Sequence, residues 1–123
     1  MKKTKVLIVD DDEWLVKQQL DILDQAGYET RATYNAWSAI DLIDDFKPDV
    51  LILDVLLPAN TVFNLIHELQ SYDDTSNIPI ILCTNIAHEL SVDNLRDYGV
   101  KLVLDKTTML PEDLVLAIKK VTL

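Results

Sequence analysis

Three predicted strands made almost wholly of aliphatic residues constrain the fold of this chain more than any other feature. They span Lys5–Val9, Asp49–Leu53 and Ile78–Cys83, and a polar residue follows each of them at once. A strand that reads as an unbroken aliphatic run is buried on both faces, as the strands of a parallel sheet are. The sequence therefore predicts a parallel sheet that is covered on both sides.

Segments with helical spacing of their apolar residues alternate with strands along the whole chain. The spacing predicts helices over Glu13–Gln25, Ala36–Phe46, Asn60–Tyr72 and Ala87–Tyr98, a fifth helix that begins at Pro111, and further strands over Tyr28–Thr33 and Lys101–Leu104. Gly27 is predicted to end the first helix and Pro48 the second. Because parallel crossovers are right-handed, this alternation predicts an α/β fold with a doubly wound, five-stranded parallel sheet.

Size and composition restrict the class of protein. With 123 residues, of which 49% are hydrophobic and 26% charged, the chain is predicted to form a single globular domain over residues 1–123. A net charge of −10 argues against direct nucleic-acid binding. The lone cysteine, Cys83, rules out an internal disulfide, and no apolar run is long enough for a signal peptide or a membrane span. We expect a soluble cytoplasmic protein that does not bind membranes.

Polar residues stand at the carboxyl ends of four predicted strands. Ligands of doubly wound sheets bind beyond these ends. The residues that occupy them are Asp10 and Asp11 after the first strand, Asp54 after the third, Thr84 after the fourth and Lys106 after the fifth. Three carboxylates, a hydroxyl and an ammonium converge at one edge if the first strand lies between the second and the third.

Each of these residues also has a simpler explanation when it is taken alone. Asp12 or Asp11 could cap the first helix, and Asp54 could be a turn residue at the end of a strand. Thr84 could fill the strand, and Lys106 could be solvated. Capping does not explain a third carboxylate, a hydroxyl and a lysine at the same edge, so the combination favours a functional site.

The chemistry that suits such a cluster is narrow. Carboxylate oxygens are the ligands of hard cations, and Mg²⁺ binds through a few of them while it keeps several waters. A carboxylate can also attack phosphorus and form an aspartyl phosphate. Phosphoryl transfer requires mainly positioning and charge neutralisation, which a cation and an ammonium provide. The cluster thus indicates Mg²⁺-dependent phosphoryl chemistry.

Four motifs together resemble the receiver domain of bacterial two-component response regulators, which is the CheY-like family. They are "VLIVDDDE" at 6–13, "DVLILDVLLP" at 49–58, "IPIILCT" at 78–84 and "LVLDK" at 102–106. The resemblance extends over nearly the whole chain. It implies a three-layer α/β sandwich with strand order 2-1-3-4-5.

The resemblance assigns a role to each residue at the site. Asp54 resembles the phosphoacceptor, which also contributes to the metal site. Asp11 resembles the direct Mg²⁺ ligand, Asp10 its partner that acts through water, and the backbone carbonyl of Leu56 the third protein ligand.

The resemblance also implies how the signal is received and passed on. Thr84 resembles the switch hydroxyl that turns to the phosphoryl group, and Lys106 the lysine that pairs with it. The phosphoryl group would come from a sensor histidine kinase or a phosphotransfer protein. The output would be a changed contact with a downstream protein that the sequence does not identify, and two copies could pair through their fourth and fifth helices. The domain is not expected to be an enzyme, although it would assist its own phosphorylation and dephosphorylation.

Three departures from the family pattern support an alternative. Val62 stands where a glycine is usual, Val103 where the switch aromatic is usual, and Thr107 where proline usually follows the lysine. The chain could accordingly be a pseudo-receiver, a protein-binding module of the same fold that no longer uses phosphorylation. A metal-dependent phosphatase is disfavoured, because Leu56 occupies the position of its acid–base aspartate. Whether the chain is a stand-alone regulator or part of a longer protein stays open.

Overall fold

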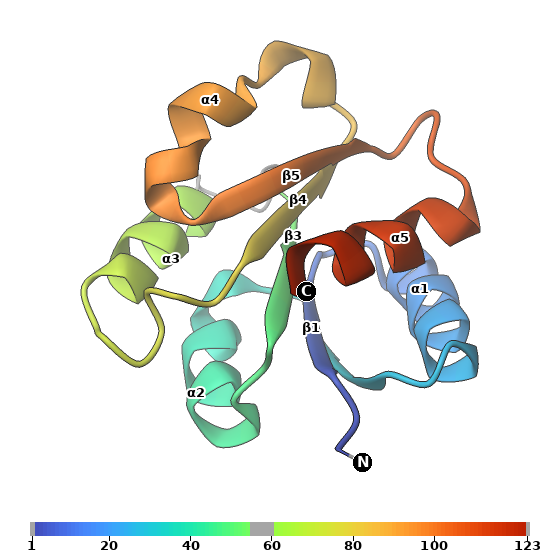
Figure 1. The fold of residues 1–123 in the computed structure, drawn as a ribbon, viewed down its shortest axis with the longest axis horizontal. Coiled ribbons are helices and arrows are strands. Elements are labelled where there is room, and N and C mark those ends of the chain that lie inside the picture. The colour runs from blue at the N-terminus through green and yellow to red at the C-terminus, as the bar shows by residue number, and fades with distance from the viewer. Residues whose placement is uncertain (1, 55–60, 123) are drawn as a thin grey trace.

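The computed structural model of this chain describes residues 2–54 and 61–122. Its central sheet has five parallel strands in the order β2-β1-β3-β4-β5 (Figure 1). The strands are β1 (Lys5–Val9), β2 (Glu29–Thr33), β3 (Val50–Leu53), β4 (Ile80–Thr84) and β5 (Val100–Asp105). The predicted fold class and strand order are both confirmed.

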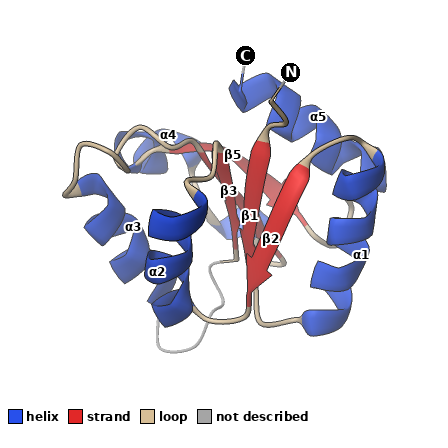
Figure 2. Ribbon diagram, turned by 90° about the horizontal axis from the view of Figure 1, so that it is seen from below, coloured by secondary structure: helices blue, strands red, loops and turns tan. Residues whose placement is uncertain are grey.

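Helices cover both faces of the sheet. The four longest are α1 (Glu13–Gln25), α2 (Ala36–Phe46), α3 (Thr61–Gln70) and α5 (Pro111–Thr122). Successive side chains of a strand point to opposite faces. Leu7 and Leu51 therefore join the apolar cluster under α2 and α3, whereas Ile8 and Ile52 join the one under α1 and α5. Figure 2 shows these two helical layers on either side of the strands.

Local signals in the sequence set the ends of the first two helices. The Asp12 carboxylate accepts a hydrogen bond of 3.1 Å from the Leu15 N–H, which makes Asp12 the N-cap of α1. Gly27, at φ 93°, follows the end of that helix as predicted. Helix α2 ends at Phe46, and its C-cap Lys47 adopts a left-handed φ of 54°, one residue before Pro48. The predicted end of the helix at Pro48 thus coincides with a left-handed residue immediately before the proline.

The prediction of one continuous helix over Ala87–Tyr98 was wrong. The segment consists of a 3₁₀ turn η2 (Ala87–Glu89), a single turn α4 (Val92–Leu95) and a second 3₁₀ turn η3 (Arg96–Tyr98). Leu90 is extended, at φ −109° and ψ 141°, and interrupts the helix. Ser91 then caps a new start, since its hydroxyl accepts from the Asn94 N–H at 3.4 Å.

Other boundaries differ from the prediction by one or two residues. Strand β4 begins at Ile80 and not at Ile78, and β5 continues to Asp105. Helix α3 ends at Gln70, two residues before the predicted end. Among the helices of the described residues, none has the length and apolar character needed to cross a membrane.

Candidate functional site

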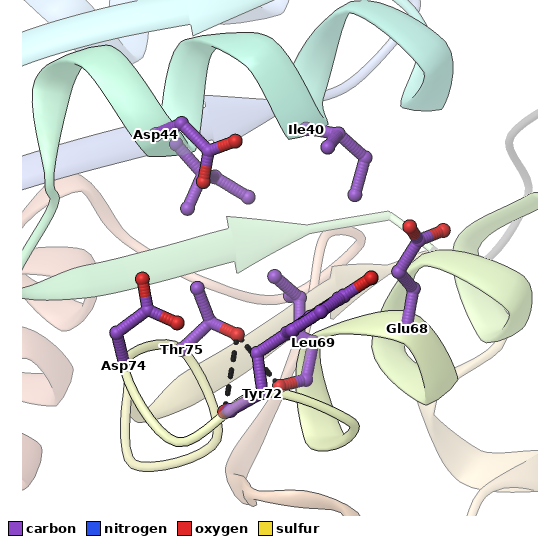
Figure 3. A pocket seen from close by; sticks show the side chains of 8 residues that line it. Ile40, Asp44, Glu68, Leu69, Tyr72, Asp74 and Thr75 are labelled. Carbon is purple, nitrogen blue, oxygen red and sulfur yellow. Dashed lines mark hydrogen bonds between the residues drawn. The ribbon is translucent and has the colours of Figure 1, made fainter.

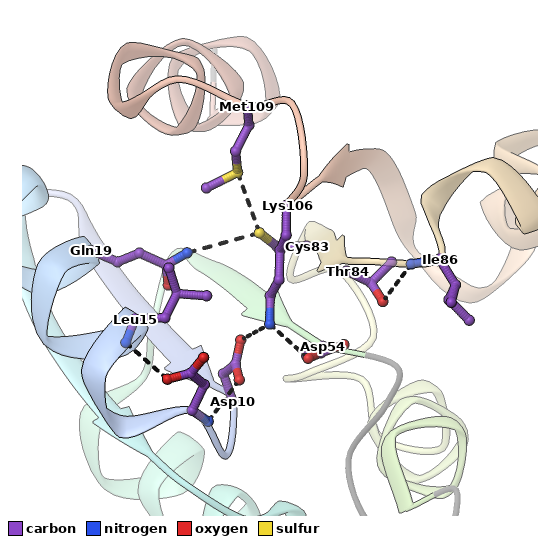
Figure 4. Close-up of polar contacts among 10 residues, drawn as sticks. Asp10, Leu15, Gln19, Asp54, Cys83, Thr84, Ile86, Lys106 and Met109 are labelled. Carbon is purple, nitrogen blue, oxygen red and sulfur yellow. Dashed lines mark hydrogen bonds and ion pairs between the residues drawn. The ribbon is translucent and has the colours of Figure 1, made fainter.

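The carboxyl edge of the sheet brings Asp10, Asp54 and Lys106 into direct contact (Figure 4). Asp10 follows β1, Asp54 follows β3 and Lys106 follows β5. Lys106 Nζ lies 2.6 Å from Asp10 Oδ2 and 2.7 Å from Asp54 Oδ2. Strand β4 lies between β3 and β5, so the lysine side chain reaches past the end of β4 to both carboxylates.

Backbone hydrogen bonds hold both carboxylates in place. The N–H of Asp10 donates to the Thr33 carbonyl and the N–H of Asp54 to the Val9 carbonyl, each over 3.2 Å. These bonds extend the sheet ladder one residue beyond the strands. The Asp10 Oδ1 atom also accepts from the Asp12 N–H at 3.0 Å. The acidic run thus combines a helix cap with a buried, anchored carboxylate.

Three carboxylates at this edge could hold a metal ion. One oxygen each of Asp10, Asp11 and Asp54 lies within 4.8 Å of the other two. Asp10 and Asp54 are buried, whereas Asp11 is exposed at the mouth of the cluster. An oxygen-only donor set that is open to solvent on one side fits Mg²⁺, which keeps several of its waters. The remaining predicted ligand, the backbone carbonyl of Leu56, lies outside the described residues.

The charges of the cluster are unbalanced without a cation. Three ionised carboxylates and the Lys106 ammonium sum to −2, which a divalent ion would neutralise. Burial raises the pKa of the Asp10 carboxyl, although hydrogen bonds from Lys106 and Asp12 oppose this. Repulsion from Asp54 is the smallest contribution to that pKa, so burial is the main cause and repulsion a minor one. Burial lowers the pKa of Lys106, but its bonds to both carboxylates outweigh burial and leave that pKa raised.

Thr84 is placed at the same edge but does not point into the carboxylate cluster. It is the last residue of β4 and is fully buried. Its hydroxyl oxygen accepts from the Ile86 N–H at 3.4 Å, on the side away from Lys106 (Figure 4). A switch role would require this side chain to turn, and that role stays a prediction.

A layer of three side chains on the α1 and α5 side of the sheet was not foreseen from the sequence. The Nε2 atom of Gln19 donates to Cys83 Sγ at 3.8 Å, and the Cys83 thiol donates to Met109 Sδ at 3.5 Å. The only signal for this layer is a glutamine on the apolar stripe of α1, between Val16 and Leu23. These side chains lie on the α1 and α5 side of the sheet.

The structure accommodates the three departures from the family pattern. Val62 is fully buried in the cluster under α2 and α3, and Val103 packs against the same cluster. The Asp105 carboxylate accepts from the Thr107 N–H at 2.8 Å and from its hydroxyl at 2.6 Å. Proline has no N–H to donate, so this turn depends on the residue that replaces it.

The fold and the site together define the class of this protein. It is a doubly wound α/β domain that carries an acidic pocket and a lysine at its topological switch point. The family model of the response regulator receiver domain matches residues 6–119. The chain belongs to this receiver domain family.

Individual relatives agree with this assignment. The polar-differentiation response regulator DivK of Brucella anthropi is 30% identical over 106 residues, which is 86% of either chain. Among solved structures, the chemotaxis response regulator CheY4 of Vibrio cholerae has a TM-score of 0.83 at 26% identity and covers 98% of this chain and 99% of its own. A two-component response regulator from Clostridium difficile has a TM-score of 0.83 at 25% identity, and the match covers 97% of this chain and 95% of that one.

Proposed function

We propose that Asp54 accepts a phosphoryl group in a Mg²⁺-dependent reaction. An Asp54 carboxylate oxygen attacks the phosphorus of a phosphohistidine, a P–O bond forms, and the P–N bond breaks with its electron pair returning to the imidazole. The observation that supports this most directly is the contact of one buried ammonium, Lys106, with both Asp54 and Asp10. Transfer of this kind depends on positioning and charge neutralisation, and this contact contributes to both.

Each residue of the cluster has a part in that proposal. Asp10 and Asp11 would hold Mg²⁺ together with Asp54, and the bound ion would neutralise the phosphoryl oxygens. Lys106 contacts the Asp54 carboxylate, and it would pair with a phosphoryl oxygen after transfer. Thr84, at the same edge, would donate its hydroxyl to another phosphoryl oxygen after a side-chain rotation.

The proposal extends to partners and location. A sensor histidine kinase or a phosphotransfer protein would supply the phosphoryl group, and a changed contact with a downstream protein would carry the signal. The domain would act in the cytoplasm, and it would modify its own side chain once and not turn over a separate substrate. Mass spectrometry would then find no more than one phosphoryl group per chain.

The test is incubation with Mg²⁺ and acetyl phosphate, followed by intact-mass measurement. We expect a gain of one phosphoryl group that Asp54→Asn abolishes and that excess EDTA prevents. Asp73→Asn is the matched control, because Asp73 is an exposed aspartate in the loop after α3. A gain that persists in Asp54→Asn would contradict the assignment of the phosphoacceptor.

The same experiment separates the proposal from the pseudo-receiver alternative, which Val62, Val103 and Thr107 motivate. Trp14 is exposed and follows the acidic run at the start of α1, so we choose its fluorescence as the probe of metal binding. In a Trp37→Phe background we expect Mg²⁺ to change that fluorescence. Neither phosphoryl gain nor a Mg²⁺ response would favour a module that binds partners without phosphorylation.

A further inference from the structure

A groove lies between α2 and the α3–β4 connection (Figure 3). Its lining includes no residue of the phosphorylation cluster, by which we mean Asp10, Asp11, Asp54, Thr84 and Lys106. We define the α2–α3 groove by the residues at its centre, which are Ile40, Ile43, Asp44, Glu68, Leu69 and Asp74. This central hollow has a volume of about 310 Å³. It shares residues with a hollow of about 170 Å³ beside Trp37 and with one of about 300 Å³ that reaches Pro48. The three together follow α2 along its length.

The groove has an apolar floor and acidic walls. Ile43 and Leu69 are part of the core, and half-buried Ile40 extends this apolar floor outward. Asp44 on α2 and Glu68 on α3 project from the two sides, as Figure 3 shows. Asp74 adds a third carboxylate at the loop end of the groove.

No lysine or arginine of the described residues forms an ion pair with these carboxylates; Lys47 lines the hollow that reaches Pro48 without pairing. Within residues 2–54 and 61–122, the side chains of Asp44, Glu68 and Asp74 form neither an ion pair nor a hydrogen bond. The segment 32–95 contains ten acidic residues and one basic residue, Lys47, and therefore carries −9 of the net charge of −10. The remainder of the chain carries only −1. The charge is thus concentrated on the half of the chain that builds this groove.

Two exposed aromatic side chains line the same groove. Trp37 is 75% exposed and borders the hollow at the start of α2, and Tyr72 is 57% exposed and lies over the centre. Tryptophan and tyrosine are enriched at the centres of protein interfaces, because they bury a large apolar area at little cost in conformational entropy. Solubility alone would explain exposed carboxylates, but it does not explain exposed aromatic rings and an aliphatic floor between them.

We propose that the α2–α3 groove binds a cationic amphipathic segment of a partner protein. Apolar side chains of that segment pack on Ile40 and between Trp37 and Tyr72, and its lysines or arginines pair with Asp44 and Glu68. Helix α2 has 11 residues and is about 16 Å long, which matches about three turns of a bound helix. No residue of the phosphorylation cluster lines the groove, so this inference does not depend on the proposed function.

The test uses a defined probe, a 14-residue helical peptide with leucines along one face and lysines on both flanks. Binding is followed by Trp37 fluorescence in a Trp14→Phe background and by NMR shift mapping. We expect a saturable complex with a dissociation constant of about 10–100 μM. Glu68→Lys should weaken it by at least about tenfold, and a peptide of the same composition with its leucines dispersed around the helix should bind at least about tenfold more weakly.

A matched charge reversal distinguishes binding in the groove from general electrostatic attraction of a cationic peptide to an acidic protein. Asp21→Lys, at an exposed position of α1 on the other face, changes the net charge equally and should weaken binding by less than about twofold. Phosphorylation by acetyl phosphate should be the same in Glu68→Lys as in the wild type. Absence of saturable binding up to about 1 mM peptide, or equal weakening by both reversals, overturns the proposal. A dimer that Glu68→Lys disrupts overturns it too, because the occupant would then be a second copy of this chain.

Discussion

Lys106 and Asp10 form a nearly buried ion pair, in which Nζ lies 2.6 Å from Oδ2 and the two side chains are only 9% and 3% exposed. The ammonium also contacts Asp54, so one cation is shared by two buried carboxylates. Breaking such a pair from one side is costly because it leaves a charge buried without compensation. The cluster is therefore held together by Lys106 when no metal ion is bound.

Replacement of that lysine should destabilise the domain in a way that Mg²⁺ partly reverses. Lys106→Met should lower the free energy of unfolding by about 3 kcal/mol at neutral pH, since Asp10 and Asp54 would lose their shared ammonium. Urea denaturation with and without Mg²⁺ measures this effect. Lys101→Met, at an exposed position of β5, is the control and should cost little. Equal stability of the two variants in the absence of Mg²⁺ would contradict the prediction.

The same variant should respond to pH in a defined direction. Burial already raises the pKa of Asp10 in the folded state, and loss of Lys106 removes an interaction that lowers it. A folded-state pKa above the unfolded value means that the folded protein binds the proton more readily, so stability falls as pH rises through that range. The deficit of Lys106→Met should hence shrink as the pH is lowered towards the unfolded pKa of aspartate. A deficit that grows on acidification would contradict this.

The sequence predicted the sheet and the position of the cluster because both depend on local signals. The aliphatic runs ending at Val9 and Leu53 indicate strands, and a parallel sheet brings Asp10 and Asp54 to one edge once the strand order is known. The contact of Gln19 with Cys83 joins residues 64 positions apart, and nothing local specifies it. Distant contacts of this kind can be read only from a structure.

The break in the predicted helix over 87–98 has a different cause. Apolar spacing favoured one helix, but Ser91 offers a side-chain cap that starts a new turn after extended Leu90. Periodicity alone does not reveal this competition. The turn at Asp105 and Thr107 was not predicted either. The family pattern indicates only that proline is absent after Lys106, and it does not specify the hydrogen bonds that Thr107 makes to Asp105.

Gly99 should tolerate a side chain less well than Gly27. Both glycines have a left-handed φ, of 86° and 93°, so alanine is strained at either site by about 1 kcal/mol. At Gly99 an added Cβ would lie 2.9 Å from Gln70 Nε2, whereas at Gly27 it would meet nothing within 4 Å. The Gln70 amide donates to the Tyr98 carbonyl at 3.0 Å and would have to move.

Thermal or urea unfolding of Gly99→Ala and Gly27→Ala tests this comparison. We expect Gly99→Ala to cost about 1 kcal/mol more than Gly27→Ala, which is the approximate worth of one hydrogen bond. In a Gln70→Ala background the difference should largely disappear, because the side chain that Cβ meets is gone. A difference that survives there would point to backbone strain alone.

The turn after β5 should keep the Asp105 carboxylate ionised to a lower pH than an ordinary aspartate. Two hydrogen bonds from Thr107 lower the pKa of Asp105, so this interaction stabilises the fold above the unfolded pKa and is lost as pH falls through the folded one. Thr107→Val removes the hydroxyl donor and should raise that pKa, as an NMR titration of the carboxyl carbon would show. Thr108→Val, at the next exposed residue, should leave it unchanged.

The Cys83 thiol should be unreactive until the domain unfolds. It is buried, and burial raises its pKa to about 11, so only about one thiol in a thousand is ionised at pH 8. Because the thiolate is the nucleophile, a disulfide reagent such as Ellman's should react with the folded protein far more slowly than with the urea-unfolded chain. When unfolding is needed to expose Cys83, Lys106→Met should speed the reaction by the same factor by which it raises the population of the unfolded state. Rapid labelling of the native wild-type protein would show that Cys83 is open to solvent in the folded domain and would contradict this prediction.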